Sequence, residues 1–115
     1  FSDENFYADL VKVILRFLRE NLHKRLTLDD ICSKFSYSRS FLCKTFKEQT
    51  GETLIACLNR LKIEEAKRLL KETSQTVTDI AASLGFREVK YFDAIFKKQT
   101  GLTPVAYREN ATKQQ

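Results

Sequence analysis

Two sets of polar and basic side chains recur along the chain at the spacing of one helix face. They are Ser40, Cys43, Lys44 and Lys47, and Lys90, Asp93, Ala94 and Lys97. Positions three or four residues apart lie on the same side of a helix. Donors and acceptors on such a face can hydrogen-bond to base edges in a DNA groove, and cations can hold phosphates.

The side chains divide by what they can reach. Lys44 and Lys90 are expected to contact bases, with a preference for guanine acceptors, and Ser40 could bond to a base as well. Cys43 could pack on a thymine methyl group, whereas Ala94 offers only apolar contact. The expected phosphate contacts are Arg39, Lys47, Arg87, Lys97 and Lys98. For each lysine the alternative is an ordinary solvated helix face.

Asp93 is the exception within these sets, because phosphates repel a carboxylate in the groove. It could accept a hydrogen bond from a cytosine amino group, or it could pair with Lys90 three residues earlier. We favour the ion pair. With Asp93 and Ala94 on its face, the second helix should read fewer bases than the first, or bind mainly through the DNA backbone.

The two sets lie within a sequence repeat. Residues 30–31, Asp-Ile, recur at 79–80, and residues 46–51, Phe-Lys-Glu-Gln-Thr-Gly, recur at 96–101 as Phe-Lys-Lys-Gln-Thr-Gly. The second copy carries one extra residue after Phe86, and insertions fall in turns. Each copy is therefore expected to form a helix, a turn and a second helix that carries the polar face.

Capping residues mark where the helices should begin. Thr27 with Asp30, and Thr76 with Asp79, have the arrangement of a capping box, and Ser38 is a good cap for the helix after it. Apolar residues at helical spacing follow the two boxes, and we expect them, Cys32 included, to lie in the core. They are Leu28, Ile31, Cys32 and Phe35, and Val77, Ile80, Ala81 and Leu84.

The same periodicity predicts the remaining helices. The first should carry an apolar stripe of Leu10, Val13, Ile14, Phe17 and Leu18. Gly51 and Gly101 should end the second helix of each copy, and Thr53 and Thr103 should each cap a further helix. The expected helices cover 7–22, 39–50, 53–71 and 88–100, with a last one beginning at Pro104. Residues 1–6 and 110–115 are expected to be polar ends, and 71–75 a hinge.

Composition limits the functional classes. Twenty Lys and Arg against fifteen Asp and Glu give a net charge of +5, which suits a polyanionic partner. The three cysteines fit neither a disulfide framework nor a zinc site, and His23 is the only histidine, so we expect no metal, cofactor or catalytic dyad. No apolar run approaches the roughly 18 residues of a membrane span, and cysteine usage favours a reducing cytoplasm.

Together these motifs resemble the DNA-binding domain of AraC/XylS-family transcription regulators. The resemblance covers about residues 13–108, nearly the whole chain. It rests on an ordered series of motifs at 26–31, 46–51, 60–70, 79–81, 85–86, 91–92, 96–98, 101, 103–104 and 107–108.

The resemblance implies an all-α fold of about seven helices in a single DNA-binding domain, 1–115. Residues 7–52 and 76–110 would form two helix-turn-helix subdomains, with 53–71 as the linking helix. Both recognition helices would enter successive major-groove segments about one turn apart. The family's base contacts would come from Ser40, Cys43, Lys44, Lys90, Asp93 and Ala94. Relatives commonly carry a small hydroxyl and a basic residue at the last two positions.

The resemblance also sets functional expectations. The partner would be double-stranded DNA, and the protein would regulate transcription without being an enzyme, more often activating it by contacting RNA polymerase. No effector-binding or dimerisation domain is recognisable, so we expect a fragment of a larger regulator rather than a stand-alone member. The alternatives are a helical protein-protein interaction module and a DNA-repair enzyme with a reactive cysteine. An interaction module would need exposed apolar anchors on the second helices.

Overall fold

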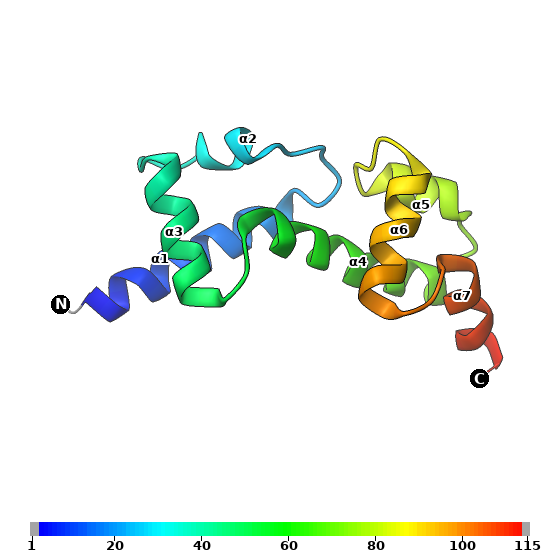
Figure 1. The fold of residues 1–115 in the computed structure, drawn as a ribbon. Helices are drawn as coiled ribbons and strands as arrows, with labels where there is room; N and C mark the ends of the chain where they lie inside the picture. The colour runs from blue at the N-terminus through cyan, green and yellow to red at the C-terminus, as the bar shows by residue number, and fades with distance from the viewer. Residues whose placement is uncertain (1–2, 114–115) are drawn as a thin grey trace. The chain divides into compact units, whose positions relative to one another are not determined.

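The computed structural model describes residues 3–113 (Figure 1). These residues form seven α-helices and no strand, which confirms the all-α fold class expected from the sequence. The helices are α1 (Asp3–Glu20), α2 (Leu28–Cys32), α3 (Arg39–Thr50), α4 (Leu54–Glu72), α5 (Val77–Ser83), α6 (Val89–Thr100) and α7 (Pro104–Lys113).

Two compact units divide the chain. Within the described residues, unit 1 comprises the chain up to Leu22 together with Leu26–Leu58, and unit 2 comprises His23–Arg25 together with the chain from Asn59 onward. The boundary falls inside α4, so this helix contributes residues to both units. Each unit contains one copy of the sequence repeat.

Unit 1 is built on α3, which packs against both α1 and α2 (Figure 1). The rings of Phe17 and Phe35 meet edge to face with their centroids 5.9 Å apart, and this contact joins α1 to the turn after α2. Val13 departs from the predicted apolar stripe, because it lies at the edge of the buried side and is 48% exposed. The core residues are Leu10, Ile14, Leu18, Ile31, Cys32, Leu42, Phe46, Leu54, Cys57 and Leu58.

Unit 2 is built on α6, which packs against α5 and α7. Aromatic rings follow one another through this unit: the centroid of Phe92 lies 5.1 Å from that of Phe86 and 5.8 Å from that of Phe96. The centroid of Phe96 lies 5.4 Å from that of Tyr107. Aromatic pairs of this kind contribute about 0.5–1.5 kcal/mol each beyond their apolar burial, so they hold α6 firmly between its neighbours.

Side-chain caps begin the helices where the sequence predicts them. Oγ1 of Thr27 accepts a hydrogen bond from the backbone N–H of Asp30 at 3.1 Å, and Oδ2 of Asp30 accepts one from the N–H of Thr27 at 2.9 Å. This is the predicted capping box, and the hydrogen bond from the Thr27 backbone is the main cause that lowers the pKa of Asp30. The other predicted caps also form, at Ser38, Thr53, Thr76 and Thr103. At Thr76 only half of the predicted capping box is present, because the Asp79 side chain does not bond back to the Thr76 N–H.

Glycines end the two second helices, as predicted. Gly51 and Gly101 have φ angles of 84° and 83°, in the left-handed region that a residue with a side chain adopts only with strain. The N–H of Gly51 donates to the carbonyl of Lys47, and that of Gly101 to the carbonyl of Lys97, both at 2.8 Å. These bonds satisfy carbonyl groups that the helix end would otherwise leave without a partner.

The first helix is displaced relative to its prediction. It begins at Asp3 and ends at Glu20, whereas the periodicity predicted 7–22 and a polar end before it. Phe6 explains part of the difference, because its ring packs edge to face against Tyr37 with centroids 6.0 Å apart. This contact lies outside the predicted stripe. The rest of the expected polar end, residues 1–2, lies outside the described residues.

The last helix is longer than predicted. It continues to Lys113, although a polar tail was expected from 110, of which residues 114–115 lie outside the described residues. Arg108 anchors this helix to the end of α4: its Nε donates to the carbonyl of Leu70 at 3.0 Å, and its Nη2 to that of Thr73 at 3.3 Å. The two bonds also satisfy carbonyl groups at the C-terminal end of α4.

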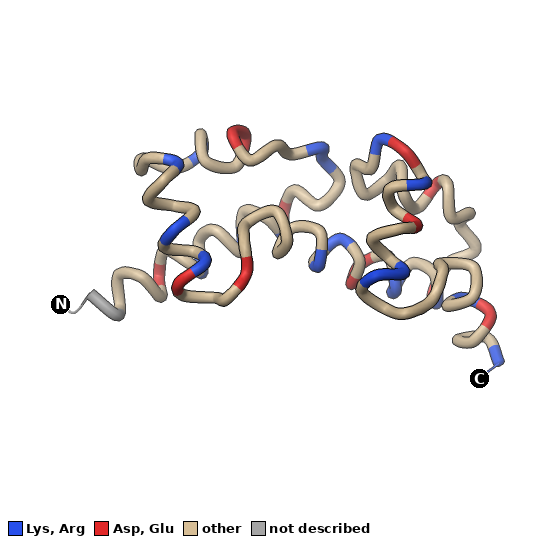
Figure 2. Tube along the Cα trace, in the orientation of Figure 1, with Lys and Arg blue, Asp and Glu red and all other residues tan. Residues whose placement is uncertain are grey.

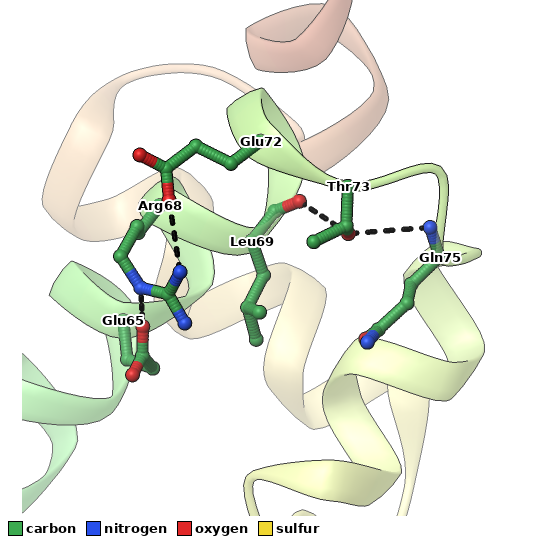
Figure 3. Close-up of polar contacts among 6 residues, drawn as sticks. All are labelled: Glu65, Arg68, Leu69, Glu72, Thr73 and Gln75. Atoms are coloured by element: carbon green, nitrogen blue, oxygen red, sulfur yellow. Dashed lines mark hydrogen bonds and ion pairs between the residues drawn. The ribbon is translucent and has the colours of Figure 1, made fainter.

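Figure 3 shows how α4 ends within unit 2. Arg68 pairs with both Glu65 and Glu72, and the hydroxyl of Thr73 donates to the carbonyl of Leu69 at 2.7 Å. Within residues 71–75, where the sequence suggested a hinge, the Thr73 hydroxyl also accepts a hydrogen bond from the N–H of Gln75.

Candidate nucleic-acid interface

Helix α3 presents the first predicted set on its outer side. Ser40, Lys44 and Lys47 are exposed, and Cys43 is half-buried at the edge of the core. The opposite side of the helix is fixed by buried Leu42, Thr45 and Phe46. A buried side and a polar outer side on one helix are what groove recognition requires.

Two of the expected phosphate contacts on α3 already have partners. Nη1 of Arg39 lies 2.8 Å from Oδ1 of Asp29, in an ion pair whose side chains are 59% and 78% exposed. Ion pairs as exposed as this contribute about 0–1 kcal/mol, so a phosphate can displace the carboxylate. Nζ of Lys47 donates to the carbonyl of Gly51 at 3.2 Å, which holds its charge near the C-terminus of α3.

Two of the three cysteines belong to the helix-turn-helix of unit 1. Cys32, the last residue of α2, is buried in the core as predicted, and Cys43 is half-buried on α3. Burial is the main cause that raises the pKa of the Cys32 thiol, and the neighbouring Cys43 raises it further. All three cysteines of the chain are free thiols.

Helix α6 presents the second predicted set. Lys90, Ala94, Lys97 and Lys98 are exposed, and Arg87 is exposed in the turn before the helix. Figure 2 shows the basic residues of α3 and α6 in blue along both helices. Within residues 3–113, none of the four basic side chains of this second set forms an ion pair or a side-chain hydrogen bond. Their charges are therefore available to an anion.

Asp93 differs from its prediction. The expected ion pair with Lys90 is absent among the described residues, and Oδ1 of Asp93 is buried without a hydrogen-bond partner. The side chain as a whole is half-buried, at the edge where α6 meets the core of unit 2. A buried carboxylate oxygen without a hydrogen-bond partner is costly, and no ion pair of Asp93 is found within residues 3–113.

A buried lysine, Lys62, which the sequence pattern did not single out, positions the segment before α2. Lys62 is only 4% exposed, and its Nζ donates to the carbonyl of Lys24 at 2.7 Å and lies 5.3 Å from the centroid of the Phe86 ring. Burial lowers its pKa to about 8. The one available signal was the placement of Lys62 between two apolar residues, Leu61 and Ile63, of the linking helix.

A shallow polar groove lies between α4 and α7 in unit 2. It is lined by Glu64, Lys67, Arg68, Lys71, Glu72 and Tyr107. Its charges are already compensated: Lys67 pairs with Glu64, and Nζ of Lys71 lies 5.5 Å from the centroid of the Tyr107 ring. The groove therefore offers no site of one charge sign.

The described part of the chain was also searched for metal sites and for membrane-spanning helices. No group of three or more His, Cys, Asp and Glu side chains there is arranged to hold a metal ion. None of the described helices is both long and apolar enough to cross a membrane.

Comparison with known proteins identifies the family. Residues 31–110 match the protein family described as "Helix-turn-helix domain". The chain belongs to this family, and its relatives are regulators of the AraC/XylS type, in agreement with the resemblance seen in the sequence.

Two relatives and one solved structure place the chain more closely. It is 34% identical over 95 residues to the xylose operon regulatory protein of Escherichia coli K12, matching 83% of this chain and 24% of that protein. It is 30% identical over 102 residues to the "bifunctional transcriptional activator/DNA repair enzyme AdaA" of Bacillus subtilis, matching 89% of this chain and 48% of that protein. The chain thus spans about a quarter and about half of these relatives.

The fold matches that of a protein solved on DNA. The DNA-binding domain of AdpA, a global transcriptional factor crystallised with a target DNA, superposes with a TM-score of 0.87 over 91% of this chain and 95% of that one. At 24% sequence identity this likeness concerns the fold.

Proposed function

We propose that this chain is the DNA-binding domain of a sequence-specific transcription regulator, in which α3 and α6 are the recognition helices. The observation that carries this proposal is the same in each unit: the second helix of a helix-turn-helix buries one side in the core and exposes a polar, basic side. A recognition helix needs that arrangement to lie in the major groove. The DNA complex of AdpA, which shares the fold, supports it.

In unit 1, α3 is the stronger reader. Lys44 and Ser40 would bond to base edges and Cys43 would meet a thymine methyl group, because these side chains share one side of the helix. Lys47 and Arg39 would hold phosphates at either end of the groove contact, with Arg39 exchanging Asp29 for a phosphate.

In unit 2, α6 would bind mainly through contacts to the phosphate backbone of the DNA. Lys90 is the one basic side chain on its face with the reach for a base edge, and Ala94 adds only apolar contact. The expected phosphate contacts of this unit are Arg87, Lys97 and Lys98, all exposed. Asp93, half-buried and unpaired, opposes the approach of phosphates.

The regulatory setting follows from the relatives. AdaA is named a transcriptional activator, and the xylose regulator belongs by name to an operon, which supports a role in transcription, activation in particular. RNA polymerase and an effector-binding or dimerisation domain outside these 115 residues would be its further partners, in the cytoplasm. We do not assign an enzymatic role, although AdaA is named a repair enzyme as well.

The rival interaction module is less well supported. It requires large apolar anchors on the outer sides of α3 and α6. Among the described residues the large exposed apolar side chains are Val13, Tyr37, Tyr91 and Val105, of which only Tyr91 belongs to either helix.

Salt dependence separates the two readings. Binding to a labelled duplex is measured by fluorescence anisotropy at several salt concentrations. Logarithmic affinity should fall with logarithmic salt at a slope of about −0.9 for each phosphate contact. Lys97→Ala should reduce the steepness of that slope by about 0.9, the value for one phosphate contact. The matched control is Lys12→Ala, because Lys12 is a basic residue on the exposed side of α1. Affinity that ignores salt would reject DNA binding.

A further inference from the structure

Two segments that are far apart in the sequence meet at the turn before α6. One is this turn, which carries Arg87, and the other is His23–Arg25, which belongs to unit 2 although it precedes α2 in the chain. A Cβ built at Gly85 would lie 2.5 Å from the carbonyl oxygen of Lys24 and 3.1 Å from the backbone nitrogen of Arg25. The backbone of His23–Arg25 therefore lies directly against the turn.

Lys62 joins these two segments on their buried side. Its side chain is 4% exposed, and its Nζ donates to the carbonyl of Lys24 at 2.7 Å. The same Nζ lies 5.3 Å from the centroid of the ring of Phe86, the residue before Arg87. One buried ammonium group thus contacts both segments, so the backbone that carries Lys24 and Arg25 has a fixed place beside the turn.

The basic side chains at this place are accessible to a partner. Lys24, Arg25 and Arg87 are all exposed. Within residues 3–113, none of the three forms an ion pair or a side-chain hydrogen bond. Glu88, which follows Arg87, is exposed and likewise forms no ion pair in that part of the chain. Three cations beside one carboxylate leave a positive surface, which attracts an anion.

We propose that Lys24 and Arg25 form, together with Arg87, a phosphate site that holds the DNA backbone beside α6. This inference rests on the proposed function, because α6 must lie in the groove for the site to meet DNA. The N-terminal residues of a recognition helix contact base edges, and phosphates border the groove. The turn before α6 and the segment packed against it therefore lie where the DNA backbone passes.

The fixed backbone favours binding by these side chains. A flexible loop loses conformational freedom when a ligand orders it, whereas Lys62 already holds His23–Arg25 in the free protein. Contacts to phosphates carry no sequence information. The site should therefore add affinity for every duplex alike, which complements a helix whose face offers Lys90 as its one basic side chain with the reach for a base edge.

The salt dependence of binding tests the phosphate site in the whole chain. Anisotropy with a labelled duplex compares the unaltered chain, the double variant Lys24→Ala/Arg25→Ala and the control Lys12→Ala/Arg16→Ala. The control removes two exposed cations of α1, so both double variants have the same net charge. The first should make the slope of logarithmic affinity against logarithmic salt shallower by about 1.8, the value for two phosphate contacts. The control should leave the slope as it is in the unaltered chain.

Ethylation of single phosphates locates the site on the DNA. An ethyl group removes the charge of one phosphate and weakens binding where the protein contacts it. The unaltered chain should show sensitive phosphates beside the block read by α6, which Lys90→Ala identifies by relaxing its specificity. Lys24→Ala/Arg25→Ala should abolish that sensitivity. A loss confined to phosphates beside the block read by α3 would contradict the placement of the site.

Lys62→Met tests whether Lys62 positions the two cations. It should lower the affinity of the unaltered chain but lower that of Lys24→Ala/Arg25→Ala little further, because no cation remains to be positioned. An equal fold-loss in both backgrounds would assign Lys62 to stability alone. The alanine variants replace exposed side chains, so they decide the phosphate site even where Lys62→Met does not fold.

Separate outcomes judge the two proposals. If Lys24→Ala/Arg25→Ala has the same salt slope and the same sensitive phosphates as the control, the phosphate site is wrong while DNA binding by α3 and α6 stands. If the unaltered chain binds no duplex at any salt concentration, the proposed function is wrong and the phosphate site fails with it.

Discussion

Lys44 is the residue on which sequence reading by α3 most depends. It is exposed and, within the described residues, free of ion pairs, and it lies one residue from the half-buried Cys43. Lys44→Ala should cost on the order of 1–3 kcal/mol of binding free energy at one base pair and relax the preference there. Competition between the best duplex and its single-pair variants measures this.

Lys47→Ala is the matched control for Lys44. Lys47 belongs to the same helix as Lys44, but its Nζ donates to the carbonyl of Gly51 at the end of α3, where a phosphate contact is expected. The control should weaken all duplexes alike. If Lys44→Ala also weakened all duplexes alike, Lys44 would be a phosphate contact and its base-reading role would be wrong.

Asp93 carries a negative charge that the structure leaves unpaired. Its Oδ1 is buried without a partner, so removing the carboxylate gives up no hydrogen bond at that atom. Asp93→Ala should therefore strengthen binding to all duplexes by about 1 kcal/mol or less, the energy of one charge near a phosphate in water. Anisotropy measures the change. Weaker binding confined to duplexes with one particular cytosine would instead indicate that Asp93 reads that base.

Lys62 should give the folding free energy a specific pH dependence. Its pKa is about 8 in the folded chain against an ordinary value of 10.5, so the unfolded chain binds more protons between these limits. The free energy of unfolding should therefore rise with pH from about 8 to about 10.5. Urea unfolding across this range should show the rise, and the Lys62→Met variant should lack it. An unchanged difference between the two proteins at every pH would contradict the assignment.

The sequence could predict the exposure of some side chains but not the surroundings of others. The exposed side chains of α3 and α6 followed from helical spacing alone. Asp93 and Lys62 did not, because an ion pair or a buried amine depends on which groups the tertiary fold brings near. Lys24, the partner of Lys62, lies 38 positions away in the chain. No local pattern encodes a contact of that range.

At the scale of the elements, Gly85 is required both for its positive φ angle and because a neighbouring backbone leaves no space for a side chain. Gly85 has a φ of +78°, and a Cβ built there would lie 2.5 Å from the carbonyl oxygen of Lys24. Gly101, with a φ of +83°, has nothing within 4 Å of such a Cβ. The two positions therefore separate backbone strain from crowding.

Alanine at these positions should give unequal losses of stability. Gly101→Ala should cost about 1–2 kcal/mol through backbone strain alone. Gly85→Ala should cost a further roughly 1–3 kcal/mol, because the Lys24 backbone held by Lys62 must move. Urea unfolding measures both. Equal losses would mean that the segment His23–Arg25 yields without cost.

Helix starts were the most predictable feature of the elements. Thr27, Ser38, Thr53 and Thr103 all cap helices as predicted, because a cap is a local bond between residues three apart. The start of α1 and the end of α7 were missed. Those ends depend on tertiary contacts, and the bonds from Arg108 to the end of α4 are one of them.

At the scale of the whole molecule, the chain repeats one design in two units of unequal chemistry. Both units carry a basic face on the second helix, and the net charge of +5 favours approach to DNA. The first unit offers three candidate base readers on α3. The second combines one lysine with an unpaired carboxylate and an alanine on α6, so it should contribute affinity more than specificity.

Selection of binding sites from a random duplex library tests whether α3 and α6 read DNA sequence together. We expect an enriched site of two blocks about one helical turn, 10–10.5 base pairs, apart, with the block read by α3 more strongly specified. Lys44→Ala should degrade only that block, which assigns it to unit 1. A library from which no sequence is enriched would contradict sequence-specific DNA binding by this chain.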